Sequence, residues 1–539
     1  MRRSIRLALP LLALAWPLLP AAAEDVRFDV DQPPIWDVTD RRPVPAPSPS
    51  DENEVARFVD VYWFRPLDDL LAIRPTFPAL DVNALDEVPA STWYLPGKTG
   101  SPAHLAGSRA IRAPITPTPV GGLERGGPWT VLEGSLESEL PYLILSDPTG
   151  ARLRVDFDEP GTPELRTAAT VISSRLLDAA GYDVSPAEIA ALGRDDLALA
   201  GGALEILAHG GHAALRAEGL DRFFAARSPA GEAGEGPARV RVAVAPLPAG
   251  ILLGGFPAHG VRADDPNDLI AHQARRSLRG LAILAAWLDH ARIREDRTCD
   301  VYLQPENYVR HTLTGLGLTL GNARARMAGG PVGFSGLHAF HPRLLDPLAW
   351  KPDQPYEPFA AMQWADALWG TRLLLSFTDD EIATAVAAGR YSDPQVADYV
   401  AGALRERRDR IGRAWCARVN ASDRFAVGSP SAGRWTLEFA DLGVRAGLRQ
   451  PEDVVYLMTM RVAETGEALG YQSRGGERLQ FDITAFAPGE WMHRLDPGRY
   501  LIAEILGWNY RGGALLGRTR VHLYFDRSSG PRVVGIVRD

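Results

Sequence analysis

The clearest hydrophobic periodicity in the chain lies between residues 275 and 290. Apolar side chains recur there at three- and four-residue steps, at Leu278, Leu281, Ala282, Ala285 and Leu288. That spacing is typical of a helix with one buried face. The pattern therefore predicts a helix that ends near His290.

Two short β-like runs follow this helix after a charged loop. They cover residues 299–303 and 309–313, and a Gln-Pro-Glu-Asn turn separates them. Such runs around a turn predict a hairpin, and the second run leads into a glycine turn at Gly315. The centre of the chain is therefore expected to fold as helix, loop, hairpin and glycine turn.

Similar short patterns precede the central stretch. Residues 142–145 and 153–157 flank an Asp-Pro-Thr-Gly turn and predict a hairpin. A helix is expected over 164–180, because glycine commonly follows a helix end and Gly181 stands there. Residues 239–244 predict a further strand. Residues 57–135 mix apolar clusters with prolines and predict an irregular layer.

Downstream, helical and then alternating patterns follow. Helices are expected over 359–377, 379–388 and 394–418, and the basic run at 405–413 is interpreted as a solvated helix face. The alternation then changes to short strands between glycine turns. We therefore predict an antiparallel β-sandwich over residues 433–539.

The N-terminus predicts export. Residues 1–23 have a basic start, an apolar segment and a small-residue end, which indicate a signal peptide cleaved before Glu24. Arg2 and Arg3 also allow twin-arginine export. Residues 24–56 are rich in Pro, Asp and Ser and predict a disordered tether. The mature chain is expected in the periplasm or outside the cell, without a transmembrane segment.

The charge of the chain limits its partners. The formal net charge of the full sequence is −9. Residues 1–23 contain three arginines and no acids, so their removal gives −12. This surface argues against nucleic acid and against anionic membranes. The length predicts two or three domains.

The order of elements resembles a family of uncharacterised exported bacterial proteins with a protein-kinase-like core. The resemblance covers residues 57–419 and is carried by short motifs, among them 82–93 (VNALDEVPASTW), 147–150 (DPTG), 264–268 (DDPND) and 391–394 (YSDP). It implies an α+β fold with a two-lobed core. The upper lobe and its N-terminal wrap would cover 57–265 and the helical lower lobe 266–420, followed by the sandwich.

The same resemblance identifies the positions that correspond to the catalytic residues of a kinase, and most of them hold other residue types in this sequence. His290 keeps the histidine of the catalytic loop. The lysine, the helix glutamate, the base and the two metal ligands are replaced by Asp156, Thr170, Arg292, Arg297 and Gly315. The resemblance therefore implies a degenerate member, a pseudokinase, with no catalytic residue, no bound metal and no cofactor.

These replacements put an acid where a kinase has a lysine and arginines where it has acidic or amide groups, and two geometries of the cleft between the lobes are then possible. In a kinase-like fold, Asp156 would face Arg292 and Arg297 across the space between the lobes. A shut cleft would pair Asp156 with one of these arginines, and we favour this geometry. An open cleft would leave Arg292 and Arg297 as a site for a carboxylate or phosphate without metal. The expected partner is an unknown protein or an anionic ligand.

Other interpretations remain open at this point. An exported transferase could use an acidic site built from Asp156, Asp158, Asp296 and Asp300. A structural envelope protein is a third possibility. Histidines 209, 212, 338 and 341 give no metal-ligand spacing, and Ser335 lacks the flanking glycines of a nucleophile elbow.

The two cysteines, Cys299 and Cys416, are the only ones in the chain. In an exported protein they could form a disulfide. They could equally be two small buried side chains. Residues 508–513 (WNYRGG) form another candidate, a binding loop between strands of the sandwich, although aromatic residues in β-domains commonly belong to the core.

Overall fold

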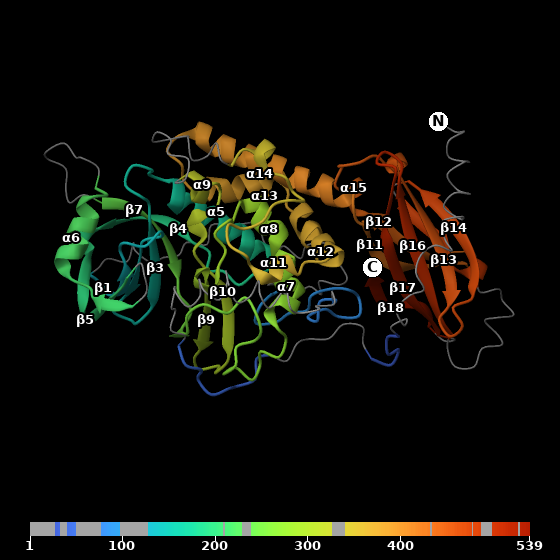
Figure 1. Ribbon diagram of the computed structural model, residues 1–539, viewed down its shortest axis with the longest axis horizontal. Coiled ribbons are helices and arrows are strands. Elements are labelled where there is room, and N and C mark those ends of the chain that lie inside the picture. Colours follow the sequence, from blue (N-terminus) through green and yellow to red (C-terminus); the bar gives the residue numbers. More distant parts are fainter. Residues whose placement is uncertain are drawn as a thin grey trace.

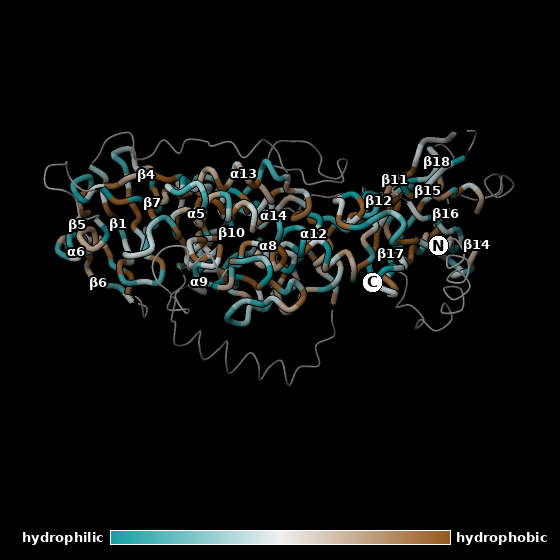
Figure 2. The backbone as a smooth tube through the Cα atoms, turned by 90° about the horizontal axis from the view of Figure 1, so that it is seen from above, coloured by the Kyte–Doolittle hydropathy of each residue, from teal (hydrophilic) through white to brown (hydrophobic). Residues whose placement is uncertain are grey.

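The computed structural model describes residues 27–32, 40–49, 77–96, 128–207, 211–228, 239–325, 340–431, 434–476, 478–486, 499–526 and 529–539. Within them, three parts follow one another along the long axis of the molecule: a seven-stranded sheet, a helical unit and a β-sandwich (Figures 1 and 2). The signal peptide prediction lies outside the described residues.

The first part is a seven-stranded sheet in the order β4-β7-β3-β2-β1-β5-β6. Its pairs are antiparallel except for β1 and β5. The strands are β1 (Trp129–Ser135), β2 (Tyr142–Ser146), β3 (Arg152–Phe157), β4 (Glu188–Gly193), β5 (Leu197–Ile206), β6 (His212–Ala214) and β7 (Arg239–Pro246). The predicted hairpin of β2 and β3 and the predicted strand β7 are confirmed.

Two helices cover this sheet. Side chains alternate along β7, so Val242 faces α6 (Ala217–Ala225) and Ala243 faces α5 (Leu165–Ala180). Phe157 and Phe223 meet edge to face at 5.0 Å in the α6 layer. The prediction of an irregular layer over 57–135 is wrong for residues 129–135, because they form β1, which pairs with β2 on one side and with β5 on the other.

The second part combines a small sheet with a helical core. Strand β8 (Gly250–Leu252) pairs with β9 (Thr298–Leu303), and β9 pairs with β10 (Val309–Leu313), as the predicted hairpin requires. The predicted helix is divided into α7 (Arg276–Arg279) and α8 (Leu281–Leu288). All eight residues of α8 are buried, because helices surround it on several sides. The others are α11 (Glu357–Ala360), α12 (Trp364–Leu375), α13 (Asp379–Ala388) and α14 (Pro394–Cys416).

The solvated face predicted for residues 405–413 is wrong for Arg407. This side chain is buried against the end of α8 and donates hydrogen bonds to backbone carbonyls. Its charge is matched by those carbonyls and by Asp289, whose carboxylate lies 3.8 Å away. A buried arginine is tolerated here because a helix end leaves carbonyl groups without donors.

The third part is the predicted antiparallel sandwich. One sheet has the order β11-β12-β15 and the other β14-β13-β16-β17-β18, and their inner faces share one apolar core. The sandwich begins before residue 433, because its first strand, β11, starts at Ser422. The strands are β11 (Ser422–Ser431), β12 (Arg434–Asp441), β13 (Val454–Val462), β14 (Ala468–Gly475), β15 (Arg478–Asp482), β16 (Arg499–Asn509), β17 (Ala514–Asp526) and β18 (Gly530–Arg538).

The described pieces of the predicted tether are docked, so the prediction of disorder over 24–56 is wrong for them. Phe28 packs on the outer face of the sandwich, 5.0 Å from the ring of His522. Val44 is buried and bonds to the backbone of Asn307, beside the hairpin of β9 and β10. Asp40 is buried and accepts two hydrogen bonds from Thr92. The buried carboxylate and apolar contacts supply the ordering that composition alone does not reveal.

Residues 77–96 join the helical unit to the sandwich. The Asp86 carboxylate contacts Arg276 of α7 and Arg538 of β18. The backbone N–H of Ile536 also donates to the carbonyl of Ala84 at 2.7 Å. The α+β class is confirmed, and the described part of the chain holds no helix with the length and apolarity that a membrane span requires.

Candidate functional site

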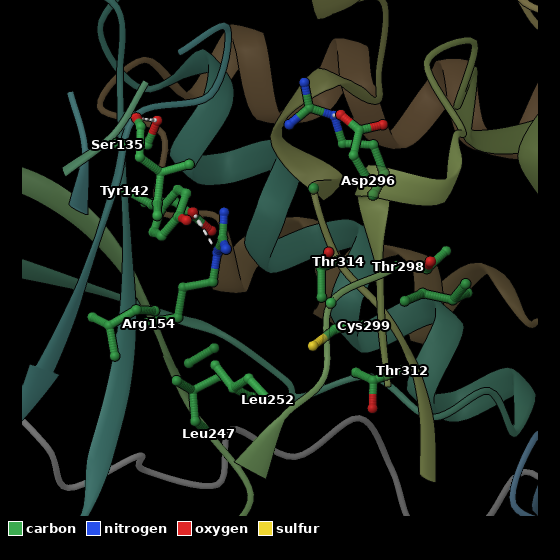
Figure 3. Close-up of a pocket in the computed structure, with 18 of the residues that line it drawn as sticks. Ser135, Tyr142, Arg154, Leu247, Leu252, Asp296, Thr298, Cys299, Thr312 and Thr314 are labelled. Carbon is green, nitrogen blue, oxygen red and sulfur yellow. Dashed lines mark hydrogen bonds and ion pairs between the residues drawn. The ribbon is translucent and has the colours of Figure 1, made fainter. Parts of the chain in front are cut away.

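A cavity of about 570 Å³ lies between the seven-stranded sheet and the small sheet of the helical unit (Figure 3). One wall comes from β1, β2 and β3, and the facing wall comes from β9, β10 and the turn before them. Leu247 and Leu252 close one end with apolar surface. Its volume is within the range of small-molecule sites.

The sheet wall is organised around Arg154 on β3. Its Nε donates to the Asp156 carboxylate at 2.9 Å, and its guanidinium lies over the Tyr142 ring at 4.0 Å. The Tyr142 hydroxyl in turn donates to Glu133 at 2.9 Å. Burial lowers the pKa of Arg154, but Asp156 and Tyr142 raise it more, so the group stays charged.

The facing wall carries a second set of matched charges. Arg294 and Arg297 flank Asp296, at 2.5 Å and 3.8 Å from its carboxylate. Thr298 and Cys299 on β9, with Thr312 and Thr314 beside them, extend this wall.

Glu139 links the two walls. It lies in the segment between β1 and β2, and its carboxylate is 3.7 Å from Arg292 and 3.4 Å from Arg297. The prediction that Asp156 pairs with one of these arginines is therefore wrong. Asp156 instead binds Arg154 on the same strand, because side chains two residues apart share one face of a sheet.

The same contacts change the predicted anion site at Arg292 and Arg297. Each arginine contacts Glu139, and Arg292 also contacts Asp353 at 3.2 Å. Arg292 is therefore held by two carboxylates away from the cavity lining, and Arg297 directs Nη2 to Glu139, so the two arginines do not form a shared anion site there.

Four of the six kinase-like positions line the cavity: Asp156, Thr170, Arg297 and Gly315. Gly315 has φ 68°, and an added Cβ would lie 2.5 Å from the side chain of Arg297. The positive φ favours glycine at this position, and a larger residue would also have to displace the Arg297 side chain. The Thr170 hydroxyl is buried and has no hydrogen-bond partner among the described residues.

The other two positions, His290 and Arg292, are not among the described residues that line the cavity. His290 is buried, and neither ring nitrogen has a hydrogen-bond partner within the described chain. Burial, with a further contribution from the charge of Arg297, lowers the pKa of His290 to about 4. The ring is therefore neutral near pH 7.

The acidic site considered from the sequence is not assembled. Asp158 accepts backbone N–H groups at the start of α5, including that of Thr167 at 2.9 Å, and so caps this helix. Asp300 is buried between Arg262 and His311. Within the described ranges, no group of acidic, histidine or cysteine side chains has the arrangement of a metal site.

Cys299 and Cys416 are not joined by a disulfide. Cys299 lies on the cavity wall, whereas Cys416 ends α14 beside the sandwich. Burial raises the pKa of the Cys416 thiol to about 12, so this thiol stays protonated. The interpretation of Cys416 as a small buried side chain is the one that fits.

The histidine candidates form no metal site within the described part of the chain. His212 is the only histidine among the described residues that line the cavity, and residues 209, 335 and 338 lie outside the described ranges. His341 accepts a hydrogen bond from the backbone of Arg343. In the segment 508–513, Asn509 accepts from the N–H groups of Arg511 and Gly512, so it shapes the turn between β16 and β17.

Sequence reasoning missed three central residues of the cavity: Arg154, Glu139 and Tyr142. Arg154 could have been found, because strand alternation places it on the same face as Asp156.

Comparisons with protein-family models, curated proteins and solved structures gave no match.

Proposed function

We propose that this protein is an exported binding protein with a pseudokinase-like core, which holds a small ligand in the cavity without phosphoryl transfer. The export part rests on the pattern of residues 1–23, and the kinase-like part rests on the resemblance carried by the motifs. The cavity supplies the ligand site.

The observation that carries the proposal is the chemistry of the cavity walls. None of the described lining residues is a lysine, which phosphoryl transfer uses to hold the nucleotide phosphates. Asp156 and Asp296 are occupied by Arg154 and Arg294 in ion pairs of 2.9 Å and 2.5 Å. Carboxylates held by arginines are poor ligands for Mg²⁺, so these walls favour binding over phosphoryl transfer.

Thermal shift measurements test the proposal. A library of small polar molecules is screened against the wild type, with Mg·ATP as one member. A bound ligand raises the melting temperature, because it stabilises only the folded state. We expect a shift with at least one library member and none with Mg·ATP.

A blocked cavity supplies the control. Thr314→Trp places an indole on the β9–β10 wall, and Thr384→Trp places the same group on an exposed face of α13. The shift should disappear in the first variant and persist in the second. A magnesium-dependent shift with ATP, or a shift that survives Thr314→Trp, contradicts the proposal.

A further inference from the structure

Arg154 leaves the hydrogen-bonding edge of its guanidinium open to the cavity. Only Nε is used by Asp156. Among the described residues, no hydrogen-bond partner is found for Nη1 or Nη2. Figure 3 shows the guanidinium directed into the space between the two walls. A planar fork of this kind matches a ligand with two oxygen atoms.

Among oxyanions, the charges of the cavity lining favour a singly charged group over a doubly charged one. Its described lining contains four carboxylates, from Glu133, Glu139, Asp156 and Asp296, against three guanidinium groups. A doubly charged phosphate would meet more repulsion from these acids than a carboxylate would. A carboxylate also fits the fork of Arg154 with two parallel hydrogen bonds.

The rest of the lining favours hydroxyl groups on the ligand. Thr170 is 6% exposed and lines the cavity, and its buried hydroxyl has no partner in the described chain. A buried hydroxyl without a partner is costly, and a ligand hydroxyl would satisfy it. The Glu133 carboxylate accepts a hydrogen bond from Tyr142 and has further lone pairs for a ligand donor.

We infer that the cavity binds a small hydroxylated monocarboxylate, such as a sugar acid, with its carboxylate on Arg154 and its hydroxyl groups near Thr170 and Glu133. This inference rests on the proposed function and names the ligand class for the same cavity. It also moves the anion-binding role from Arg292 and Arg297 to Arg154.

A matched set of probes tests the charge requirement. D-glucuronate, D-glucose and D-glucose 6-phosphate share one sugar ring and differ in the group at its end. Isothermal titration calorimetry on the full chain should show that glucuronate binds at least about 10-fold more tightly than either of the other two. Glucose has no oxyanion for the Arg154 fork, and the second negative charge of the phosphate is repelled by the carboxylates that line the cavity. Equal or tighter binding of glucose or of its phosphate overturns the inference.

Variants of Arg154 test the assignment to this residue. Arg154→Lys keeps the charge next to Asp156 but removes the fork, so glucuronate affinity should fall about 10- to 100-fold. Arg239→Gln changes an ion-paired arginine on the same sheet that does not line the cavity, and its affinity should equal that of the wild type. Unchanged affinity in Arg154→Lys, with a wild-type melting temperature, overturns the inference.

The outcomes separate this inference from the proposed function. If another library member binds and Thr314→Trp abolishes its shift, while no sugar acid binds, the ligand class is wrong and the cavity site stands. If no library member shifts the melting temperature, both fall.

Discussion

Removal of the Arg407 side chain should destabilise the helical unit strongly. Its guanidinium donates to the carbonyls of Trp287 at 2.9 Å and Ala286 at 2.6 Å, at the end of α8. It also lies over the Phe340 ring at 4.5 Å, and the side chain is 2% exposed. Arg407→Ala would leave those carbonyls and the nearby Asp289 carboxylate buried without this donor.

The size of the effect follows from these contacts. A hydrogen bond to a charged group contributes about 1.5–3 kcal/mol, and such bonds within one network do not add fully. Removing one partner from a buried ionic network costs about 3–5 kcal/mol. We therefore expect Arg407→Ala to lower the free energy of unfolding of the helical unit by about 3–5 kcal/mol.

Urea unfolding followed by far-UV circular dichroism measures this change, because the long helices belong to this unit. Arg405→Ala is the matched control: it lies in the same basic run, its side chain is 37% exposed, and it pairs loosely with Asp379 at 4.0 Å. An exposed pair contributes about 0–1 kcal/mol. Equal midpoints for the two variants would refute the assignment of Arg407 as a buried helix-end donor.

Three further predictions test other contacts. The pKa of His290 is about 4 in the folded protein and about 6.5 in the unfolded chain. The free energy of unfolding should therefore be highest above about pH 6.5 and should fall by about 3 kcal/mol as the pH drops to about 4. His290→Leu should flatten this part of the plot of stability against pH, and an unchanged plot would contradict the burial of a neutral ring. Gly315→Ala should cost about 1–2 kcal/mol because of its positive φ, measured by thermal unfolding, and a neutral result would contradict that backbone conformation. Asp86→Asn removes the carboxylate shared by Arg276 and Arg538, so the sandwich and the helical unit should unfold in more separate calorimetric transitions, whereas an unchanged single transition would show that Asp86 does not couple them.

The elements with strong periodicity were predictable from the sequence. The helix pattern before His290 and the hairpin at 299–313 depend on local spacing, and the structure has both. Strands β4 and β5 were missed because they are rich in alanine and glycine, which carry little strand signal. Their pairing depends on neighbouring strands that lie far away in the sequence.

The cavity shows the same limit for function. The resemblance indicated positions such as Asp156 and Gly315, and these do line the cavity. It gave the wrong partner for Asp156, because an ion pair depends on which cation lies closest in space. Glu139 carried no motif and becomes significant only where the fold places it between Arg292 and Arg297.

Alkylation of Cys299 is the measurement that tests the cavity site most directly. Cys299 lies on the cavity wall, and buried Cys416, with a thiol pKa of about 12, is an internal reference that should stay unmodified. Iodoacetamide labelling is followed by mass spectrometry in the presence of millimolar D-glucuronate or millimolar Mg·ATP. We expect glucuronate to slow the modification of Cys299 and Mg·ATP to leave its rate unchanged. Protection by Mg·ATP, or by neither compound, contradicts a cavity that binds a hydroxylated carboxylate without nucleotide chemistry.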